Sequence, residues 1–248
     1  MSASLYTSES LHWLRFLSRW TLTTVLMTLA LVVVYLGGIG FAPSDTALGA
    51  EYSELLQAVR APAIYRLAMF FDASGWLMMG GVLLTLAVIL KRDAPIRAML
   101  IAACGAGLLV GVLGGVMRLT AIGDLAARYA TGTPAQQAAL LGPALAVYET
   151  VGALFVVGDM LAGAAYLLIA SVAFAWAAFP RWLASWFVLA GSLSLLQGIT
   201  SAIGAFSFPI LLLTVVVGVI GLHLAITLAF WRLSTESVAA PAGEAATA

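Results

Sequence analysis

Three charged residues lie within or at the edge of otherwise apolar stretches of this sequence, and their spacing places them at one level. Asp72, Arg118 and Asp159 each lie 19 to 22 residues along the chain from a basic residue that flanks the same stretch. At about 1.5 Å per residue in a helix, all three are about 30 Å from those basic residues. Carboxylates and a guanidinium at one level can form ion pairs, or they can offer sites to an anion and to a cation or proton.

More polar residues lie just outside this level if the helices continue outward. A tyrosine lies seven residues before Asp72, and another lies eleven residues before Asp159, which are offsets that return to the same helical face. A further charged residue follows each tyrosine directly. The candidate ligand-binding or structural ion cluster therefore consists of Tyr65, Arg66, Asp72, Arg118, Tyr148, Glu149 and Asp159.

Two interpretations of this cluster remain open. It can be a structural set of ion pairs that fixes the register of the helices, since charges near helix ends reach water at low cost. It can also be an outward-facing polar pocket that binds a small ligand or lipid head group, or that serves a small transporter, since polar residues in membrane helices are often functional. Three carboxylates can collect a divalent metal, but the arginine partners argue against it, and no metal site is predicted.

The composition identifies the elements that must position these residues. Of 248 residues, 63% are hydrophobic and only 9% are charged, whereas an ordinary soluble domain has about 25% charged residues. A membrane-spanning helix needs about 20 mostly apolar residues. Six stretches meet this requirement, at residues 20–41, 70–90, 98–117, 160–179, 182–203 and 209–231. The predicted fold is an all-α, polytopic membrane bundle of six transmembrane helices.

Basic residues predict the orientation, because they collect on the cytoplasmic side of membrane proteins. With both termini inside, the seven inner basic residues are Arg15, Arg19, Lys91, Arg92, Arg97, Arg181 and Arg232. The four outer ones are Arg60, Arg66, Arg118 and Arg128. We therefore expect an N-in, C-in, multi-pass protein. The apolar run at residues 21–36 is longer than the hydrophobic region of a usual signal peptide, so we read it as a membrane helix.

The remaining segments complete a single domain over residues 1–233, followed by a disordered cytoplasmic tail at residues 234–248. Residues 11–20 are expected to form a short amphipathic helix at the inner surface. Two helices are expected in the outer loops, at residues 45–60 and 133–142. The second is expected to open at Thr133 and Pro134 and to close at Gly142 and Pro143, which is the usual order of capping residues.

A row of small residues on the third spanning helix predicts close helix packing. Ala103, Gly107, Gly111 and Gly115 are spaced by four residues and so share one face. This face can receive another helix of the same chain, which we favour, or a second subunit of a homo-oligomer or larger membrane complex. The other expected partners are membrane lipids and a small ligand.

Several classes of function are excluded. The formal net charge is zero and no large basic cluster occurs, so no nucleic-acid partner is expected. One cysteine, Cys104, excludes an internal disulfide and a cysteine-built metal site. The only lysine, Lys91, lies in an inner turn, which excludes a retinal Schiff base. No nucleotide-binding or zinc-protease motif is present on a suitable element. No cofactor is predicted, and we expect a protein that is not an enzyme.

One enzymatic alternative remains, an intramembrane serine hydrolase that uses Ser192 and His223. These residues are expected at similar depth on neighbouring helices, and a six-helix chain with a serine and a late histidine resembles the rhomboid proteases. The chain departs from that family because Leu193 follows the serine where rhomboids have glycine. It also contains no asparagine to form the oxyanion site. A dyad requires a hydrogen bond between the two side chains.

The chain also resembles a group of uncharacterised bacterial six-helix integral-membrane proteins classed as a domain of unknown function. The resemblance covers about residues 15–203. It rests on Tyr65 and Arg66 followed by Asp72, on Arg118 at the end of the third helix, on a long outer loop, and on the sequence from Phe179 to Leu183. It implies a shared fold and a location in the bacterial inner membrane, and it implies no activity, substrate or catalytic residue.

Overall fold

The computed structural model describes residues 8–34, 52–175, 179–205 and 208–239, and within them it has helices and no strand. Six helical segments in this part of the chain are long and apolar enough to cross a membrane: His12–Val34, Pro62–Leu90, Pro95–Thr131, Pro134–Ala175, Arg181–Ala202 and Pro209–Arg232. The predicted all-α, multi-pass membrane bundle is confirmed.

The six spans pack side by side into a closed ring. The helices that build it are α1 (Ser8–Val34), α3 (Pro62–Leu90), α4 (Pro95–Gly107), α5 (Leu109–Met117), α7 (Pro134–Ala175), α8 (Arg181–Ala202) and α10 (Leu222–Ala239), with the π-helical η5 (Thr214–Gly221) leading into α10. Helix α1 packs against α3 and α10, α3 against α4 and α5, and α7 against α4, α5 and α8. Helix α8 closes the ring against η5 and α10.

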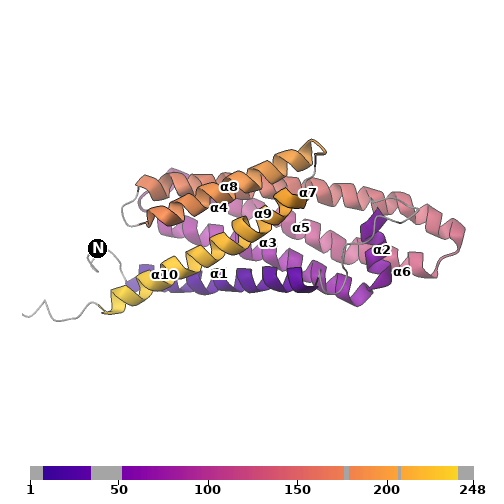
Figure 1. Ribbon diagram of the computed structural model, residues 1–248, viewed down its shortest axis with the longest axis horizontal. Helices are drawn as coiled ribbons and strands as arrows, with labels where there is room; N and C mark the ends of the chain where they lie inside the picture. The colour runs from indigo at the N-terminus through magenta and orange to yellow at the C-terminus, as the bar shows by residue number, and fades with distance from the viewer. Residues whose placement is uncertain (1–7, 35–51, 176–178, 206–207, 240–248) are drawn as a thin grey trace, which may run out of the picture.

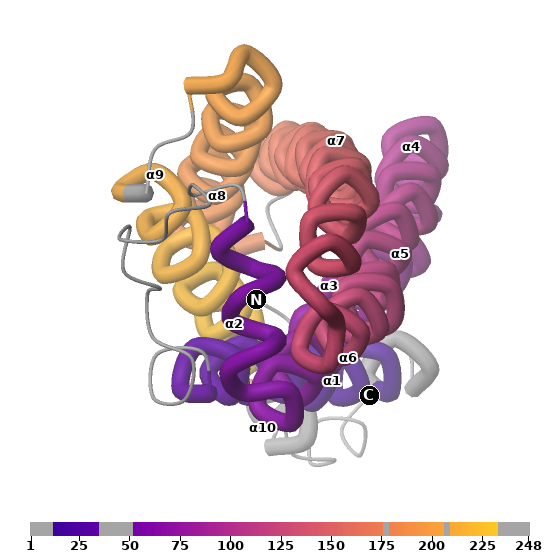
Figure 2. The backbone as a smooth tube through the Cα atoms, turned by 90° about the vertical axis from the view of Figure 1, so that its right-hand side faces the viewer, coloured from indigo at the N-terminus to yellow at the C-terminus, as the bar shows by residue number. Residues whose placement is uncertain are grey.

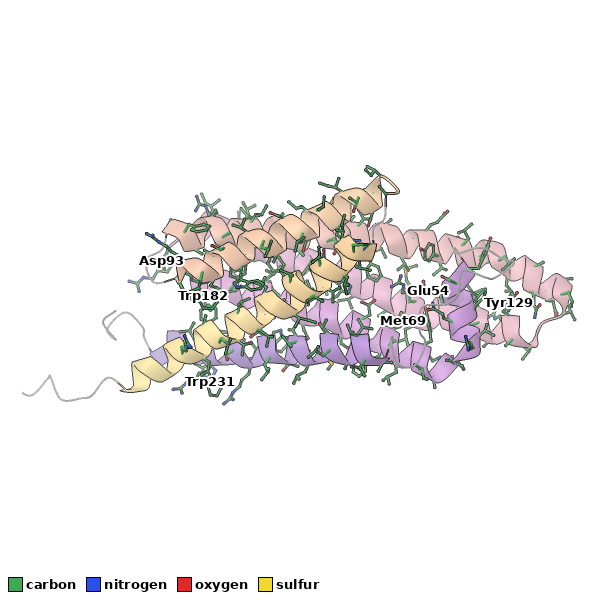
Figure 3. The ribbon with its side chains drawn as sticks, in the orientation of Figure 1. Glu54, Met69, Asp93, Tyr129, Trp182 and Trp231 are labelled. Atoms are coloured by element: carbon green, nitrogen blue, oxygen red, sulfur yellow. The ribbon has the colours of Figure 1, made fainter. Side chains whose placement is uncertain are left out.

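The bundle has two distinct ends (Figure 1). Helix α1 begins and α10 ends at the same end, which also holds the turn between α3 and α4. We name it the inner end, and its labelled residues include Asp93 and Trp231 (Figure 3). The opposite, outer end carries α2 (Ser53–Arg60) and α6 (Gly123–Thr131), with Glu54 and Tyr129 nearby. Viewed from the outer end, α2 lies across the bundle between α7 and α9 (Phe208–Leu213) (Figure 2).

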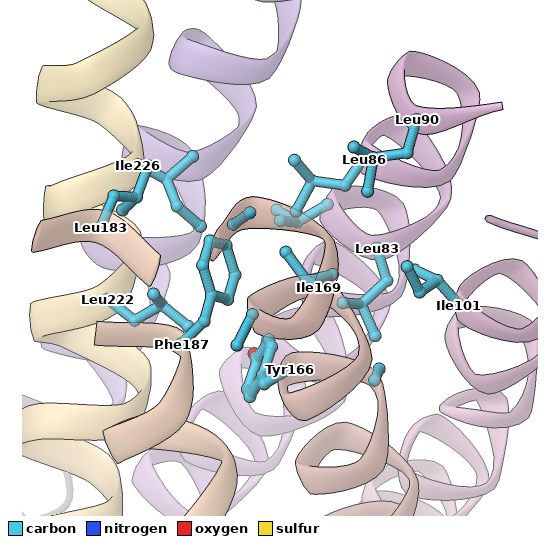
Figure 4. Packing of buried hydrophobic residues seen from close by; sticks show 14 of the residues in the cluster. Leu83, Leu86, Leu90, Ile101, Tyr166, Ile169, Leu183, Phe187, Leu222 and Ile226 are labelled. Carbon is cyan, nitrogen blue, oxygen red and sulfur yellow. The ribbon is translucent and has the colours of Figure 1, made fainter. Parts of the chain in front are cut away.

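Large apolar side chains fill the interior of the ring, between the helices (Figure 4). Tyr166 of α7 and Phe187 of α8 are 1% and 0% exposed, and their ring centroids are 6.0 Å apart. Leu222 and Ile226 of α10 approach from the other side (Figure 4). The residues of this core come from helices that are distant in sequence. Their contacts with one another give the ring of helices a defined interior.

The sequence predicted a separate short helix at the inner surface for residues 11–20. The structure does not have this separate helix. Helix α1 is continuous from Ser8 to Val34, and it includes both residues 11–20 and the described part of the predicted span 20–41. Leu14 and Leu17 are buried in the core. No helix-breaking residue interrupts this segment, so the helix continues and its apolar face packs into the ring rather than lying on the membrane surface.

The predicted outer helix at residues 133–142 is also wrong as a separate element. Helix α7 continues through Gly142 and Pro143 and has 42 residues. A proline inside a helix removes one N–H donor and frees the carbonyl four residues earlier. Pro143 is exposed, so its ring needs no space in the core, and the freed carbonyl can bond to water. The fourth span therefore begins far outward of residue 160.

Other predicted boundaries also change. The span predicted at residues 70–90 begins at Pro62, and the one at 98–117 begins at Pro95 and continues to Thr131 through the π-helical η4 (Arg118–Ile122). The last two spans agree closely with 182–203 and 209–231. Of the predicted outer helix 45–60, α2 covers Ser53–Arg60. Helix α10 includes residues 234–239 of the predicted tail. Residues 35–51, 176–178 and 240–248 lie outside the described residues.

Candidate charge cluster at the outer end

Arg118 connects three separate elements at the outer end. It begins η4, where the extra residue in the π turn changes the direction of the side chains that follow α5. Its Nε lies 2.9 Å from Glu54 Oε1 of α2, and its Nη1 lies 3.8 Å from Asp72 Oδ2 of α3. The guanidinium carbon lies 4.7 Å from the centroid of the Phe155 ring of α7. This one cation therefore joins α2, α3 and α7.

Glu54 belongs to this site, and it is not among the site residues that the sequence predicts. The hydroxyl of Tyr65 donates a hydrogen bond of 2.6 Å to the same Glu54 Oε1 that faces Arg118. Helix α2 reaches this position because it is amphipathic. Its buried Leu55 and Ala58 join a second apolar cluster with Ile122 of η4. Apolar packing therefore positions the helix, and Glu54 attaches it to the charged residues.

Asp72 is only partly satisfied by its neighbours. Trp76, one turn further along α3, provides a side-chain hydrogen bond to the Asp72 carboxylate. The Oδ2 atom is buried and has no hydrogen bond among the described residues, since the 3.8 Å to Arg118 is an ion-pair distance rather than a hydrogen bond. The side chain of Asp72 is 18% exposed. Asp72 thus has an acceptor oxygen available inside the cluster.

Asp159 also lacks a protein partner within the described ranges, but neither of its oxygens is among the buried atoms without a hydrogen bond. It is partly buried on α7 and lies close enough to Asp72 for the two charges to interact. Among the described residues it has no ion pair and no hydrogen bond. The cluster of Glu54, Asp72, Arg118 and Asp159 therefore holds three carboxylates and one guanidinium. No group of three or more metal-binding side chains that could hold a metal ion occurs in the described part of the chain.

Glycines allow the helices to approach closely enough to form this cluster. The Trp76 indole fits against Gly111 of α5 and Gly158 of α7, and it stacks on Phe155 with ring centroids 5.6 Å apart. A Cβ atom at Gly158 would lie 2.8 Å from Trp76 Cζ3. The predicted glycine face of the third span therefore packs within the same chain, since Gly107 likewise meets Leu161 of α7.

The structure does not bring three predicted site residues into the cluster. Arg66 is exposed and lies beside Gly123 of α6. Tyr148 is 40% exposed and Glu149 is exposed, and no ion pair within the described residues links either charged residue to the cluster. Successive residues on a helix point about 100° apart. Arg66 therefore cannot face the cluster together with its neighbour Tyr65.

One face of α7 connects the outer end with the core. Tyr148, Gly152, Asp159 and Tyr166 follow one another on this face. Tyr166 is 1% exposed, Asp159 is partly buried, and Gly152 is exposed and has no atom within 4 Å of a built Cβ. Tyr148 is again exposed. The face therefore opens progressively toward the outer end, and Asp159 lies at the boundary between its open and closed parts.

The structure does not support the Ser192 and His223 dyad. Ser192 is exposed on α8, whereas His223 is 0% exposed. The Nδ1 atom of His223 bonds to the Val219 carbonyl oxygen at 2.6 Å, and its Nε2 atom has no hydrogen bond among the described residues. No hydrogen bond therefore joins the serine to the histidine, because the helical rotation of α8 turns Ser192 away from the core. The catalytic role of this pair therefore stays a prediction, without the contact between the two side chains that a dyad requires.

No protein-family model, no curated protein and no solved structure matches this chain. What the outer end can do must therefore be reasoned from its own side chains. They offer carboxylate oxygens and aromatic rings, and the single guanidinium is already engaged.

Proposed function

We propose that this chain is a multi-pass protein of the bacterial inner membrane that binds a small ligand or lipid head group at its outer end. The site is the charge cluster of Glu54, Asp72, Arg118 and Asp159, and the protein is not an enzyme. The bacterial inner membrane is supported by the resemblance to bacterial six-helix proteins and by the excess of basic residues at the inner end. The outward position of the cluster follows from the same excess.

One observation carries this proposal: the cluster contains carboxylate groups that the rest of the protein leaves unsatisfied. Buried polar groups in proteins almost always have hydrogen-bond partners. Here Asp72 Oδ2 has none, and Asp159 has neither an ion pair nor a hydrogen bond among the described residues. If the cluster consisted only of ion pairs that brace the bundle, each carboxylate would be expected to face a cation. Asp159, which interacts with Asp72, faces none among the described residues.

The cluster divides into two halves with different roles. Glu54, Tyr65 and Arg118 contact one another directly and attach α2 to the bundle. We name them the closed half. Asp72 and Asp159 interact with each other while lacking a full set of partners. We name them the open half. The structural interpretation of the cluster therefore suits the closed half, and ligand binding suits the open half.

A panel of ligands tests this proposal. The full-length protein is purified in mild detergent, and its thermal unfolding is followed by tryptophan fluorescence with small cations, anions, zwitterions and lipid head groups. We expect at least one class to raise the unfolding temperature of the wild type, because a ligand that binds only the folded state stabilises it. Asp159→Asn should abolish this rise, whereas Asp124→Asn, an exposed outer carboxylate on α6, should retain it.

A panel without any stabilising class would contradict ligand binding, provided that the protein is folded and elutes as a single species. Native mass spectrometry of the same preparation gives a second measurement. A mass that co-purifies with the wild type and is absent from Asp159→Asn supports the proposal. If Asp159→Asn instead unfolds at a lower temperature than the wild type and nothing binds either protein, the cluster only braces the bundle.

A small transporter that uses Asp72, Arg118 and Asp159 is the second candidate, and Tyr166 favours it. Tyr166 lies two helical turns inward of Asp159 on α7, and its buried hydroxyl has no hydrogen-bond partner among the described residues. Polar groups thus continue from the outer end toward the middle of the membrane. Uptake of the identified ligand into proteoliposomes would distinguish transport from binding, since a binding protein gives occupancy without accumulation inside the vesicles.

A further inference from the structure

We propose that the open half of the cluster recognises an ammonium group, carried by a small amine or by an ethanolamine lipid head group, between Asp72 and Asp159. This inference rests on the proposed ligand-binding function and names the chemical class of the ligand. A protonated amine has one positive charge and up to three N–H donors. The open half offers the matching features, namely negative charge and unsatisfied oxygen acceptors.

The charges favour a cation over an anion. Arg118 is the only basic residue in the cluster, and its Nε lies 2.9 Å from Glu54 while its guanidinium covers the Phe155 ring. An anion would have to displace Glu54 and approach two further carboxylates. A cation between Asp72 and Asp159 instead relieves the repulsion of two like charges that interact in a partly buried place.

Tyr166 supplies an independent observation. It is 1% exposed, and its hydroxyl has no hydrogen-bond partner among the described residues. It shares the face of Asp159, and in helices long side chains lean toward the helix N-terminus. The N-terminus of α7 is its outer end, so we expect the Tyr166 hydroxyl to lean toward Asp159. The phenolic oxygen can therefore accept a hydrogen bond from a group that the carboxylates hold.

The available acceptors match an ammonium better than other cations. Asp72 Oδ2, the Asp159 carboxylate and the Tyr166 hydroxyl are three acceptors that lack partners among the described residues, and a primary ammonium has three N–H donors. A divalent metal would need several water molecules to complete its coordination, and Arg118 repels its double charge more strongly than the single charge of an ammonium.

Access to this position is available from the outer end. The α7 face that carries Asp159 becomes exposed at Gly152, where a built Cβ meets no atom within 4 Å. On α3, Gly75 lies one turn from Asp72 and also has no neighbour within 4 Å of a built Cβ. Open space therefore lies outward of Asp159 along α7 and one turn inward of Asp72 along α3, and an external amine or a lipid head group would enter along the α7 side.

Thermal unfolding of the full-length protein in detergent tests the ammonium. Methylammonium chloride and ethanolamine hydrochloride are compared with tetramethylammonium chloride, sodium chloride and sodium phosphate at one pH and one ionic strength. We expect methylammonium and ethanolamine to raise the unfolding temperature and the other salts to leave it unchanged. Tetramethylammonium is the decisive comparison because it has the same charge without an N–H donor.

Three variants locate the site. Asp72→Asn and Asp159→Asn should each weaken the apparent affinity for methylammonium by about tenfold or more, because each loses a charge-assisted hydrogen bond. Tyr166→Phe should weaken it less while keeping the preference over tetramethylammonium. Asp124→Asn should bind as the wild type does. If an Asn variant does not fold, Tyr166→Phe still decides whether the hydroxyl contributes.

Reconstitution separates the two sources of the ammonium. In nanodiscs, ethanolamine lipids should stabilise the wild type more than choline lipids if the ligand is a head group, whereas equal stability together with a response to soluble amine identifies a free amine. The ammonium proposal would be contradicted by equal effects of methylammonium and tetramethylammonium, or by stabilisation by phosphate that depends on Arg118. Either result would leave the proposed ligand binding intact. No stabilisation by any compound in the wider panel would overturn both proposals.

Discussion

Replacing Gly115 by alanine should weaken the contact between α3 and α5 directly beneath the charge cluster. A Cβ atom at this position would lie 2.8 Å from Ala73 Cβ and 2.9 Å from both Ala73 Cα and Ala73 N. Two of these three atoms belong to the backbone of α3, which no side-chain rotation can move. The two helices must therefore separate or tilt to admit one methyl group.

The size of the effect follows from two opposing terms. Overpacking a well-packed contact costs about 1–3 kcal/mol, and alanine recovers about 0.5–1 kcal/mol relative to glycine inside a helix. We expect Gly115→Ala to lower the free energy of unfolding by about 1 kcal/mol, within the range of about 0–2.5 kcal/mol that remains when the helix gain is subtracted from the overpacking cost. Gly75→Ala is the matched control on α3, because its Cβ meets no atom within 4 Å. It should be neutral or more stable by up to about 1 kcal/mol.

The measurement is the free energy of unfolding in detergent, from reversible denaturant titration of both variants and the wild type. Gly115 lies three residues before Arg118, so the same variant should lengthen the 3.8 Å approach of Arg118 to Asp72 and weaken any ligand that binds there. A Gly115→Ala protein as stable as Gly75→Ala would refute the close approach of α3 and α5 on which the site is built.

Three further outcomes are expected. Tyr65→Phe should lower the free energy of unfolding by about 1.5 kcal/mol or more, since it removes the 2.6 Å hydrogen bond to Glu54. If proteolysis of α2 is unchanged in this variant, Tyr65 does not attach that helix to the bundle. A fluorophosphonate probe should not label the purified protein, and labelling lost in Ser192→Ala would restore the hydrolase. Thr21 and Thr227 hydroxyls are 2.7 Å apart between α1 and α10. A double-mutant cycle to valine should give a coupling of about 0.5–1 kcal/mol, and strictly additive effects would contradict that bond.

The six spanning helices could be predicted because each of them carries its own signal. Lipid offers the backbone no hydrogen-bond partners, so a sufficiently long apolar segment must form a helix wherever it lies in the ring. Counting residues from the basic flanks also placed Asp72 and Arg118 at one level, since helical rise is nearly constant. Their 3.8 Å approach additionally depends on Gly115, whose small size could be read in the sequence.

Glu54 and the ends of the helices could not be predicted in the same way. The sequence predicted a helix at residues 45–60 in an outer loop, but which residues its charged side meets depends on how α2 docks on α6. Pro143 was read as a stop because a proline usually ends a helix. Its exposed position, which makes the proline tolerable, is a property of the folded protein and not of the local sequence.

The length of α7 has a mechanical consequence. Its 42 residues extend for about 63 Å, roughly twice the thickness of the hydrocarbon layer. Asp159 lies 25 residues from its first residue, so about 38 Å of this helix, with Pro143 inside it, extends outward beyond Asp159. A tilt of the outer end of α7 is transmitted along the helix to Phe155 and Asp159. The outer part of α7 can therefore act as a lever arm that pivots near the outer boundary of the hydrocarbon layer.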